Sequence, residues 1–522
     1  MQDYVKRILS ARVYDVAIET PLDPMARLAA RLGRPVRLKR EDLQPIHSFK
    51  LRGAYNKMVR LSPEALARGV VCASAGNHAQ GVALAAQRLG VEAVVVMPRT
   101  TPAIKVEAVA ARGARVVLHG DGFDEASAEA RRLEAEGGRV FVHPFDDADV
   151  IAGQGTVGME ILRQHPDPVE AIFLPIGGGG LAAGVAAYAR FLRPGIRLVG
   201  VEPEDAASMA AALAAGRRVA LDRVGLFADG VAVRQAGSET FRLCQALLDE
   251  VVTVSADEIC AGVKDVFDDT RAVAEPSGAL SVAGLKRFAA REGVAGASGD
   301  GSGDHLGDGA PGGALVAINT GANLNFDRLR HIAERAEIGE RREALLAVTI
   351  PEEPGSYRRF VEAFGERAIT EFNYRYSDPR AAHVFVGVQI DGAREAQAIL
   401  ARLRERGYAA LDMSGDEMAK LHVRHMVGGR AAGLRNERLF RFEFPERPGA
   451  LRRFLDGMAR GWTISLFHYR NHGADHGRVL VGLQVPPADD ARFERFLHNL
   501  GYPHWEETAN AAYALFLQAS GD

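Results

Sequence analysis

Cysteine is scarce in this sequence. Its 522 residues include three cysteines, Cys72, Cys244 and Cys260, and none of them belongs to a CxxC pair. An odd number of widely spaced cysteines predicts neither a disulfide framework nor a structural zinc site. The N-terminal segment lacks the apolar core of a signal peptide, because charged residues interrupt it every few positions. We therefore expect a reducing, cytoplasmic location.

Net charge and membrane-spanning runs are nearly absent as well. The chain has 64 Lys plus Arg and 67 Asp plus Glu, a formal net charge of -3, so electrostatics gives no reason to expect nucleic acid or a membrane surface as partner. One uncharged run reaches spanning length at 171–189, but it contains Pro175 and four consecutive glycines. These residues predict a turn between two elements, and no membrane helix is expected.

What the sequence does contain is the composition of a folded protein, with 47% hydrophobic and 25% charged residues. Its length predicts about three or four domains. From about position 70 to 320, short β-branched runs alternate with alanine-rich helical stretches. This alternation predicts βαβ units with parallel strands in two α/β lobes. Residues 294–313 contain eight glycines, and we expect them to form a mobile surface loop.

An internal repeat follows about position 342. The segment LLAVTIPEEPGSYRRFVEAF at 345–364 is matched by LFRFEFPERPGALRRFLDGM at 439–458. The offset is 94 residues between Pro351 and Pro445, and 95 between Val386 and Val481. A period of this length indicates a duplicated domain. Each copy predicts a βαββαβ, ferredoxin-like α+β domain, at 343–423 and 437–522, with a linker at 424–436.

Lys50 is the first candidate for chemistry. It lies in HSFKLRGAYNKM, at the expected start of a helix that Ser48 would cap. The positive end of a helix dipole and burial both disfavour an ammonium, which lowers the pKa of a lysine as a Schiff-base nucleophile requires. The alternative from this segment alone is an ordinary solvated lysine.

Two further segments predict anion-binding helix starts. CASAGNHAQG ends a strand and begins a helix near Asn77, where free N–H groups and an amide are available; the alternative is an ordinary turn capped by asparagine. AIFLPIGGGGLAAG places four glycines between a strand and a helix. Glycines allow successive N–H groups to surround a phosphate. The segment fits neither a Walker nor a GxGxxG motif, and its alternative is a structural turn.

A reactive lysine, an amide-lined helix start and a glycine phosphate site together suit pyridoxal 5′-phosphate. The motifs SFKLRGA, SAGNHAQGVA, GGGGL, AEPSGA and TGANLNFDRLR resemble those of fold-type II pyridoxal phosphate enzymes. Over the whole chain the sequence resembles the biosynthetic threonine deaminases (threonine ammonia-lyases). The resemblance implies an α/β, two-lobed, tryptophan synthase β-like catalytic region at 1–342, followed by two ACT-like regulatory domains.

The resemblance also assigns roles to residues. Lys50 would be the catalytic Schiff-base lysine, Phe49 a packing neighbour of the ring, and Asn77 the donor to the 3′ oxygen of the cofactor. The phosphate would be lined by Gly177, Gly178, Gly179, Gly180 and Leu181. The hydroxyl of Thr320 would face the pyridine nitrogen. The substrate would be held by the asparagine loop, Ser74, Ala75, Gly76, Asn77 and His78.

Three positions depart from related enzymes. Thr320 stands where serine is more familiar, and Ala75 stands where serine racemases carry the serine that acts on the opposite face of the substrate. Ser208 occupies a position where an acidic metal ligand would be expected. We therefore predict elimination rather than racemisation, and no metal.

The implied reaction converts L-threonine to 2-oxobutanoate and ammonia, with L-serine as a second substrate, since a pocket discriminates one methyl group by only about 1 to 3 kcal/mol. Isoleucine is expected to inhibit and valine to relieve that inhibition, and the resemblance implies a homotetramer. Two alternatives stay open at this point. One is a β-replacement synthase or racemase on the same fold, and the other is a non-catalytic amino-acid sensor.

Overall fold

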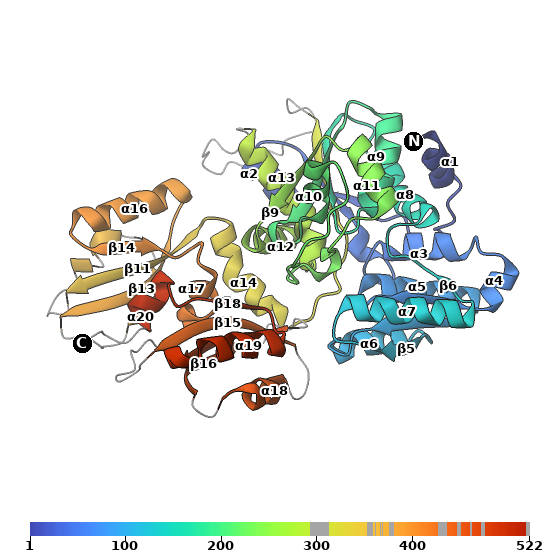
Figure 1. Ribbon diagram of the computed structural model, residues 1–522. Coiled ribbons are helices and arrows are strands. Elements are labelled where there is room, and N and C mark those ends of the chain that lie inside the picture. The colour runs from blue at the N-terminus through green and yellow to red at the C-terminus, as the bar shows by residue number, and fades with distance from the viewer. Residues whose placement is uncertain are drawn as a thin grey trace. The chain divides into compact units, whose positions relative to one another are not determined.

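A computed structural model describes residues 1–292, 313–351, 359–360, 362–365, 367, 369–374, 380–425, 436–445, 450–459, 462–470 and 476–517. These residues form two compact units, Met1–Ala336 and Glu337–Asp522 (Figure 1). The glycine-rich loop expected at 294–313 lies outside the described residues except for Gly313.

A six-stranded sheet forms the larger lobe of the first unit, in the order β1-β2-β10-β7-β8-β9. Its strands are β1 (Leu22–Pro24), β2 (Val36–Arg40), β7 (Val169–Pro175), β8 (Arg197–Pro203), β9 (Glu250–Val254) and β10 (Ala314–Asn319). All neighbours pair in parallel except β1, which is antiparallel to β2 at one edge. The strands predicted after position 171 are therefore confirmed.

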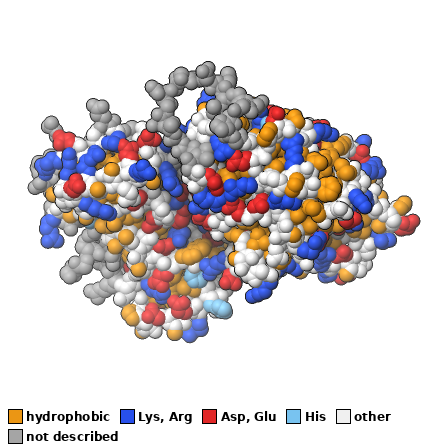
Figure 2. Space-filling view, turned by 90° about the horizontal axis from the view of Figure 1, so that it is seen from above, with side chains coloured by type: hydrophobic (Ala, Val, Ile, Leu, Met, Phe, Trp, Pro, Cys, Tyr) orange, Lys and Arg blue, Asp and Glu red, His pale blue; other side chains and the backbone are white. Residues whose placement is uncertain are grey.

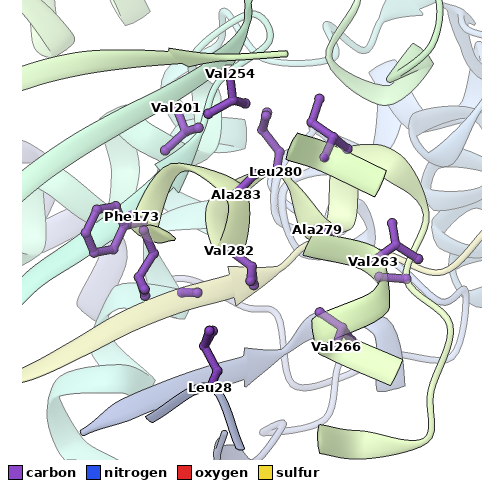
Figure 3. Packing of buried hydrophobic residues seen from close by; sticks show 14 of the residues in the cluster. Leu28, Phe173, Val201, Val254, Val263, Val266, Ala279, Leu280, Val282 and Ala283 are labelled. Carbon is purple, nitrogen blue, oxygen red and sulfur yellow. The ribbon is translucent and has the colours of Figure 1, made fainter. Parts of the chain in front are cut away.

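Helices cover both faces of this sheet because alternate residues of each strand point to opposite sides. Ala171 and Phe173 pack with helices on one face, and Ile172 and Leu174 with helices on the other. The first face carries α2 (Ala26–Leu32), α12 (Ala256–Thr270) and α13 (Pro276–Arg291), and the second carries α8 (Ala148–Gln164), α9 (Gly180–Leu192), α10 (Ser208–Ala215) and α11 (Ser238–Leu247). Figure 3 shows side chains of α13 directed between the strands and α12.

The smaller lobe has four parallel strands in the order β5-β4-β3-β6. They are β3 (Val70–Ala73), β4 (Ala93–Met97), β5 (Arg115–Leu118) and β6 (Val140–Phe141). One face packs on α3 (Lys50–Met58) and α5 (Asn77–Leu89), and the other on α7 (Phe123–Gly137). The remaining helices of the unit are α1 (Gln2–Leu9), α4 (Pro63–Ala67), α6 (Ala103–Ala110) and α14 (Arg328–Gly339), whose last residues enter the second unit. Two α/β lobes are thus confirmed.

The second unit contains the two predicted repeats, each with a four-stranded antiparallel sheet. The first sheet has the order β12-β13-β11-β14 and the second β16-β17-β15-β18, which is the ferredoxin-like arrangement. The first copy contains β11 (Glu343–Pro351), β12 (Ile369–Tyr374), β13 (Ala381–Gln389), α16 (Ala393–Glu405), β14 (Ala409–Asp412) and α17 (Glu417–Leu421). The second contains β15 (Glu437–Pro445), α18 (Ala450–Gly457), β16 (Thr463–Arg470), β17 (His476–Gln484), α19 (Asp490–Leu500), β18 (His504–Glu506) and α20 (Ala511–Phe516).

The two copies share one hydrophobic core, and equivalent residues of each copy contribute to it. Pairs offset by 94 residues are Leu345 with Leu439, Met418 with Ala512, Ala419 with Tyr513 and Val423 with Leu517, and Phe385 with Leu480 is offset by 95. Such reciprocal use of one surface is typical of a two-fold interface. The duplicated domains therefore pair with each other inside one chain.

Both copies also contain the same irregular strand. A register shift falls between Ile369 and Glu371 in β12, and between Ile464 and Leu466 in β16. The residues inside the shifts, Thr370 and Ser465, donate their hydroxyls to the glutamates that begin β11 and β15, Glu343 and Glu437. The repeat thus conserves a polar contact as well as the hydrophobic pattern.

Charged side chains of both signs are mixed on the molecular surface. In the view of Figure 2, Lys and Arg side chains lie among Asp and Glu side chains over the described residues. This distribution agrees with the formal net charge of -3.

Candidate active site

Three loops of the first unit begin where the parallel strands β3, β7 and β10 end. Asn77 follows β3, the glycines Gly177–Gly180 follow β7, and Thr320 follows β10. In α/β sheets, ligands bind outside the carboxyl ends of the strands. The start of α3 joins this edge, since Phe49 N donates to Thr320 O at 3.3 Å and Ser48 bridges to Gly321.

Lys50 begins α3 as the sequence predicted. Its Nζ donates to the carbonyl of Pro144 at 3.2 Å. Burial lowers the pKa of Lys50 to about 8, while the nearby charge of Glu275 opposes that shift. The side chain therefore exchanges a proton close to neutral pH, which the alternative of a solvated lysine would not explain.

Ser48 is not the N-cap residue of this helix, although its Oγ accepts from Lys50 N at 3.5 Å. The residue at the N-cap position is Phe49, and no side chain caps the helix. Ser48 is fully buried and pairs with Gly321 through its backbone. The chain turns one residue later than a serine cap requires, because the backbone of Ser48 and Phe49 is held by the loop after β10.

The helix that carries Lys50 is anchored by a buried ion network. Arg52 is fully buried and contacts Glu41 at 2.8 Å and Glu160 at 2.6 Å. Lys39 contacts Glu160 at 2.6 Å, and both side chains are fully buried. A buried charge without a partner is costly, so these groups hold one arrangement of α3 against α8. The sequence analysis missed this network, although Arg52 stands in the motif SFKLRGA.

Asn77 is the first residue of α5, and its side chain contacts residues outside that helix. The N-cap residue is Gly76, so the interpretation of Asn77 as a cap does not hold. Asn77 Nδ2 donates to Glu275 Oε1 at 2.7 Å, and Asn77 Oδ1 accepts from Asn323 Nδ2 at 2.7 Å. The amide is thereby held at both ends, and one of its two N–H bonds remains for a ligand.

The rest of this loop separates into accessible and structural residues. Ser74, Ala75 and Gly76 are partly exposed, and Ser74 Oγ accepts from Gly76 N at 3.2 Å. His78 is 3% exposed, and its Nε2 lies 2.9 Å from Val142 O. Burial lowers the pKa of His78 to about 3. His78 is thus held neutral.

The glycine loop has no room for side chains. A Cβ on Gly178 would overlap the ring of Phe145, and one on Gly177 would lie 2.9 Å from Val231 Cα. Gly179 has a φ of 93°, which disfavours other residues, and it begins α9 with no side-chain cap. Four glycines are therefore required by the geometry, and the uncapped helix start presents N–H groups that suit an anion.

Phe49, Leu181 and Thr320 are all buried, at 9%, 4% and 4% exposure. Phe49 and Leu181 belong to the hydrophobic core of the larger lobe, so Leu181 is available to a ligand through its backbone. The ring centroid of Phe49 lies 5.3 Å from Lys50 Nζ. Thr320 Oγ1 donates to the carbonyl of Ser277 at 3.0 Å.

Sequence reasoning missed Glu275 and Asn323. Glu275 is 4% exposed and accepts from Ser277 Oγ at 2.8 Å as well as from Asn77. Both residues stand in motifs that the sequence displays, AEPSGA and TGANLN. Their positions in those motifs were the available signal, but only the fold shows that they meet Asn77.

These residues fit pyridoxal phosphate. The segment 143–146 connects the two ends of the site, because Pro144 O accepts from Lys50 and the ring of Phe145 lies over Gly178. Lys50 would supply the amine, the uncapped start of α9 the phosphate site, and Asn77 a donor to a ring oxygen. Each donor suits one part of the cofactor.

Comparison with known proteins agrees with this fit. The family model described as pyridoxal-phosphate dependent enzyme matches residues 13–298. That of the C-terminal regulatory domain of threonine dehydratase matches residues 334–423 and 428–517. The fold and site thus define a pyridoxal-phosphate-dependent enzyme.

Relatives match the chain over nearly its whole length. It is 59% identical over 518 residues to a biosynthetic L-threonine dehydratase of Burkholderia multivorans, covering 99% of each chain. It is 52% identical over 516 residues to that of Escherichia coli, covering 99% of this chain and 97% of the relative. The chain belongs to the biosynthetic threonine dehydratase family, which carries C-terminal regulatory domains.

Solved structures also resemble this chain over part of its length. Processed threonine deaminase isoform 2 of Solanum lycopersicum is 48% identical with a TM-score of 0.60, covering 64% of this chain and 93% of that one. Maize serine racemase is 31% identical with a TM-score of 0.56, covering 63% and 95%. The two-lobed fold is shared by both.

Neither a group of metal ligands nor a membrane-spanning helix occurs in the described part of the chain. Within the described ranges, no three or more His, Cys, Asp or Glu residues are grouped to hold a metal ion. Ser208 is fully buried with an unpartnered hydroxyl, and Glu202 accepts from Met209 N and Ala210 N at 2.8 Å each. No helix in the described part of the chain is long and apolar enough to cross a membrane.

Proposed function

We propose that this protein is an L-threonine ammonia-lyase that converts L-threonine to 2-oxobutanoate and ammonia, and acts more weakly on L-serine. The observation that carries the proposal is Lys50, a lysine with a pKa lowered to about 8 beside a glycine-lined helix start. The names of the relatives, biosynthetic L-threonine dehydratases, support the same substrate.

The site residues have separate roles. Pyridoxal phosphate, when bound, would supply an electron sink for the substrate Cα. Lys50 Nζ accepts the Cα proton, since its pKa is tuned towards neutral pH. The N–H groups at the start of α9 hold the phosphate, contributed by Gly177, Gly178, Gly179, Gly180 and Leu181.

Asn77 and Thr320 set the electronic environment. Asn77 donates to the 3′ oxygen of the cofactor with the N–H that Glu275 leaves free. Thr320 Oγ1, which donates to Ser277 O at 3.0 Å, would turn its neutral hydroxyl to the pyridine nitrogen of a bound cofactor, where it would not hold a proton as a carboxylate would. This choice favours loss of the β-hydroxyl. The loop Ser74, Ala75, Gly76, Asn77 and His78 forms the substrate side of the site, and Ala75 offers no group for racemisation.

A product assay tests the function. Purified enzyme incubated with L-threonine should release 2-oxobutanoate and ammonia in equal amounts, and L-serine should give pyruvate at a lower rate. Formation of D-threonine or of a β-substituted amino acid would indicate a racemase or a replacement synthase. Binding of amino acids without any ammonia release would indicate a sensor.

Regulation is proposed for the second unit, with domains at 343–423 and 437–522 after a catalytic region at 1–342. We infer that isoleucine binds there and inhibits, that valine relieves inhibition, and that the protein is a cytoplasmic homotetramer. The paired repeats support this, because effectors act by favouring one of two arrangements of packed domains. The turns EEPGS and ERPGA, whose backbone groups would receive the charged ends of an amino acid, lie almost wholly outside the described residues.

An effector titration tests regulation apart from catalysis. Isoleucine should lower activity, and valine added at fixed isoleucine should restore it, with coupling of about 1 to 3 kcal/mol. A chain truncated after about residue 342 should keep activity and lose both responses. An active full-length enzyme indifferent to both amino acids would make the repeats assembly domains. Sedimentation at the monomer mass, 56.1 kDa, would contradict the tetramer.

A further inference from the structure

Glu275 occupies an unusual place for a carboxylate. It is the N-cap residue of α13, yet its side chain does not cap that helix. Its Oε1 instead accepts from Asn77 Nδ2 at 2.7 Å and from Ser277 Oγ at 2.8 Å. Its backbone N donates to Gly321 O at 3.1 Å, so the loop after β10 holds the residue in the site. Local helix chemistry therefore does not explain this glutamate.

The carboxylate is enclosed and lacks an ion pair. Glu275 is 4% exposed, and a Cβ on Gly321 would lie 2.6 Å from its Oε1. Within the described part of the chain, no Lys, Arg or His nitrogen forms a salt bridge with it. Other charges that act on it include Asp229 and Lys105, which pair with each other at 2.6 Å, and its interaction with Lys50 raises the pKa of that lysine. Arg328 Nη1 lies 3.7 Å from Asp229 Oδ1.

Glu275 acts on the two functional groups of the proposed site at once. It is the charge that raises the pKa of Lys50 against the effect of burial. It also fixes the Asn77 amide, whose oxygen is occupied by Asn323. A buried carboxylate costs free energy unless hydrogen bonds or a cation stabilise it, and Glu275 accepts hydrogen bonds from the Asn77 amide and the Ser277 hydroxyl.

We propose that Glu275 is a positioning residue of the active site, whose carboxylate orients the Asn77 amide and places a negative charge in the environment of Lys50. The inference rests on the proposed function for its catalytic meaning. The effect of the Glu275 charge on Lys50 does not depend on the substrate. Ionised Glu275 would keep Lys50 protonated until a higher pH or a bound ligand favours its neutral amine.

The test measures the titration of Lys50 in the full-length protein after removal of the cofactor. The rate at which an amine-specific reagent labels Lys50 is followed against pH by peptide mass spectrometry. Wild type should give a midpoint at a pKa of about 8. Glu275→Gln keeps the oxygen and removes the charge, so its midpoint should fall by roughly 0.5 to 2 pH units.

Two matched variants separate charge from structure. Asn323→Ala removes the other contact of Asn77 without changing a charge, and its Lys50 midpoint should equal that of wild type. Ser277→Ala removes a donor that stabilises the carboxylate, so its midpoint should fall in the same direction as Glu275→Gln but by less. The serine variant serves the same purpose if Glu275→Gln does not fold.

A second measurement tests the role of Glu275 in orienting the Asn77 amide. The dissociation constant of pyridoxal phosphate, measured by fluorescence with the cofactor-free protein, should rise roughly 2- to 10-fold in both Glu275→Ala and Asn323→Ala. A Lys50 midpoint that does not move in Glu275→Gln and Ser277→Ala would overturn the inference. Because neither measurement involves threonine, such a failure would leave the proposed lyase activity to be judged by its own product assay.

Discussion

Asn510 Nδ2 donates to Asp416 Oδ2 at 3.3 Å, and the two residues occupy the same position in the two C-terminal repeats, 94 residues apart. Each is the N-cap of a short helix, since Asp416 accepts from Ala419 N and Asn510 from Ala512 N. A residue that touches its own repeat equivalent lies on the local two-fold axis of the pair. The axis therefore passes between α17 and α20.

The contact between Asn510 and Asp416 predicts that the effects of their substitution on the free energy of unfolding are not additive. Asp416→Ala and Asn510→Ala should each destabilise the second unit by about 1 kcal/mol through loss of a cap. The double variant should cost about 0.5 to 1 kcal/mol less than the sum, because both single variants remove the same hydrogen bond. Denaturant unfolding of the three variants measures this coupling, and strict additivity would contradict a shared contact.

Removal of Lys50 should abolish catalysis without unfolding the protein. Lys50→Ala loses the group that accepts the Cα proton, so kcat should fall by about 10³-fold or more. The matched control is Lys57→Ala on the same helix, which loses a surface ion pair to Asp147 worth at most about 1 kcal/mol. Formation of 2-oxobutanoate is the measurement, and comparable activity of both variants would refute the assignment of Lys50.

The glycine loop predicts a local effect on cofactor affinity. An alanine at Gly179 would require a φ of 93° and place its Cβ 2.8 Å from Met209 Cε. We expect Gly179→Ala to raise the dissociation constant of pyridoxal phosphate by about 10-fold or more, since the strain costs roughly 1 to 2 kcal/mol.

Gly216 provides a control for that substitution. Its φ is 63°, and no atom lies within 4 Å of a Cβ placed there. Gly216→Ala should lower the free energy of unfolding by about 1 kcal/mol and leave the dissociation constant for the cofactor unchanged. Equal loss of affinity in both variants would show that backbone strain, and not the phosphate site, controls binding.

The buried carboxyl of Glu275 predicts a pH dependence of stability. Burial, followed by the charge of Asp229, raises its pKa from 4.5 to about 7. Between these values the folded protein binds the proton more tightly than the unfolded chain, so this group lowers stability as pH rises through the window. Glu275→Gln lacks the effect. Its free energy of unfolding relative to wild type should therefore increase by up to about 3 kcal/mol between pH 4.5 and pH 8, both without cofactor. A flat difference across that range would contradict the raised pKa.

Local patterns predicted much of the fold and part of the site. The strands around Val70 and Ala171, the helix starts at Lys50 and Gly180, and the duplicated domains all follow from hydrophobic periodicity and glycine placement, which depend on neighbours in the chain. Ser48 lies one residue before the N-cap residue Phe49, and its backbone pairs with Gly321, a contact far away in sequence that the local pattern did not predict.

The partners of Asn77 could not be predicted for the same reason. Glu275 and Asn323 lie 198 and 246 residues away. The buried network of Arg52 with Glu41 and Glu160 likewise joins three elements. Charged residues are ordinarily exposed, so only the packing of α3 against α8 shows that these are enclosed.

The reciprocal core between the two repeats changes how the second unit responds to dilution. Two separate ferredoxin-like domains that met through Leu345 and Leu439 would dissociate as their concentration fell. Because the copies are fused in one chain, each is present near the other at an effective concentration of roughly millimolar. The pair therefore stays together at any enzyme concentration, so the proposed effectors would act on a permanent pair.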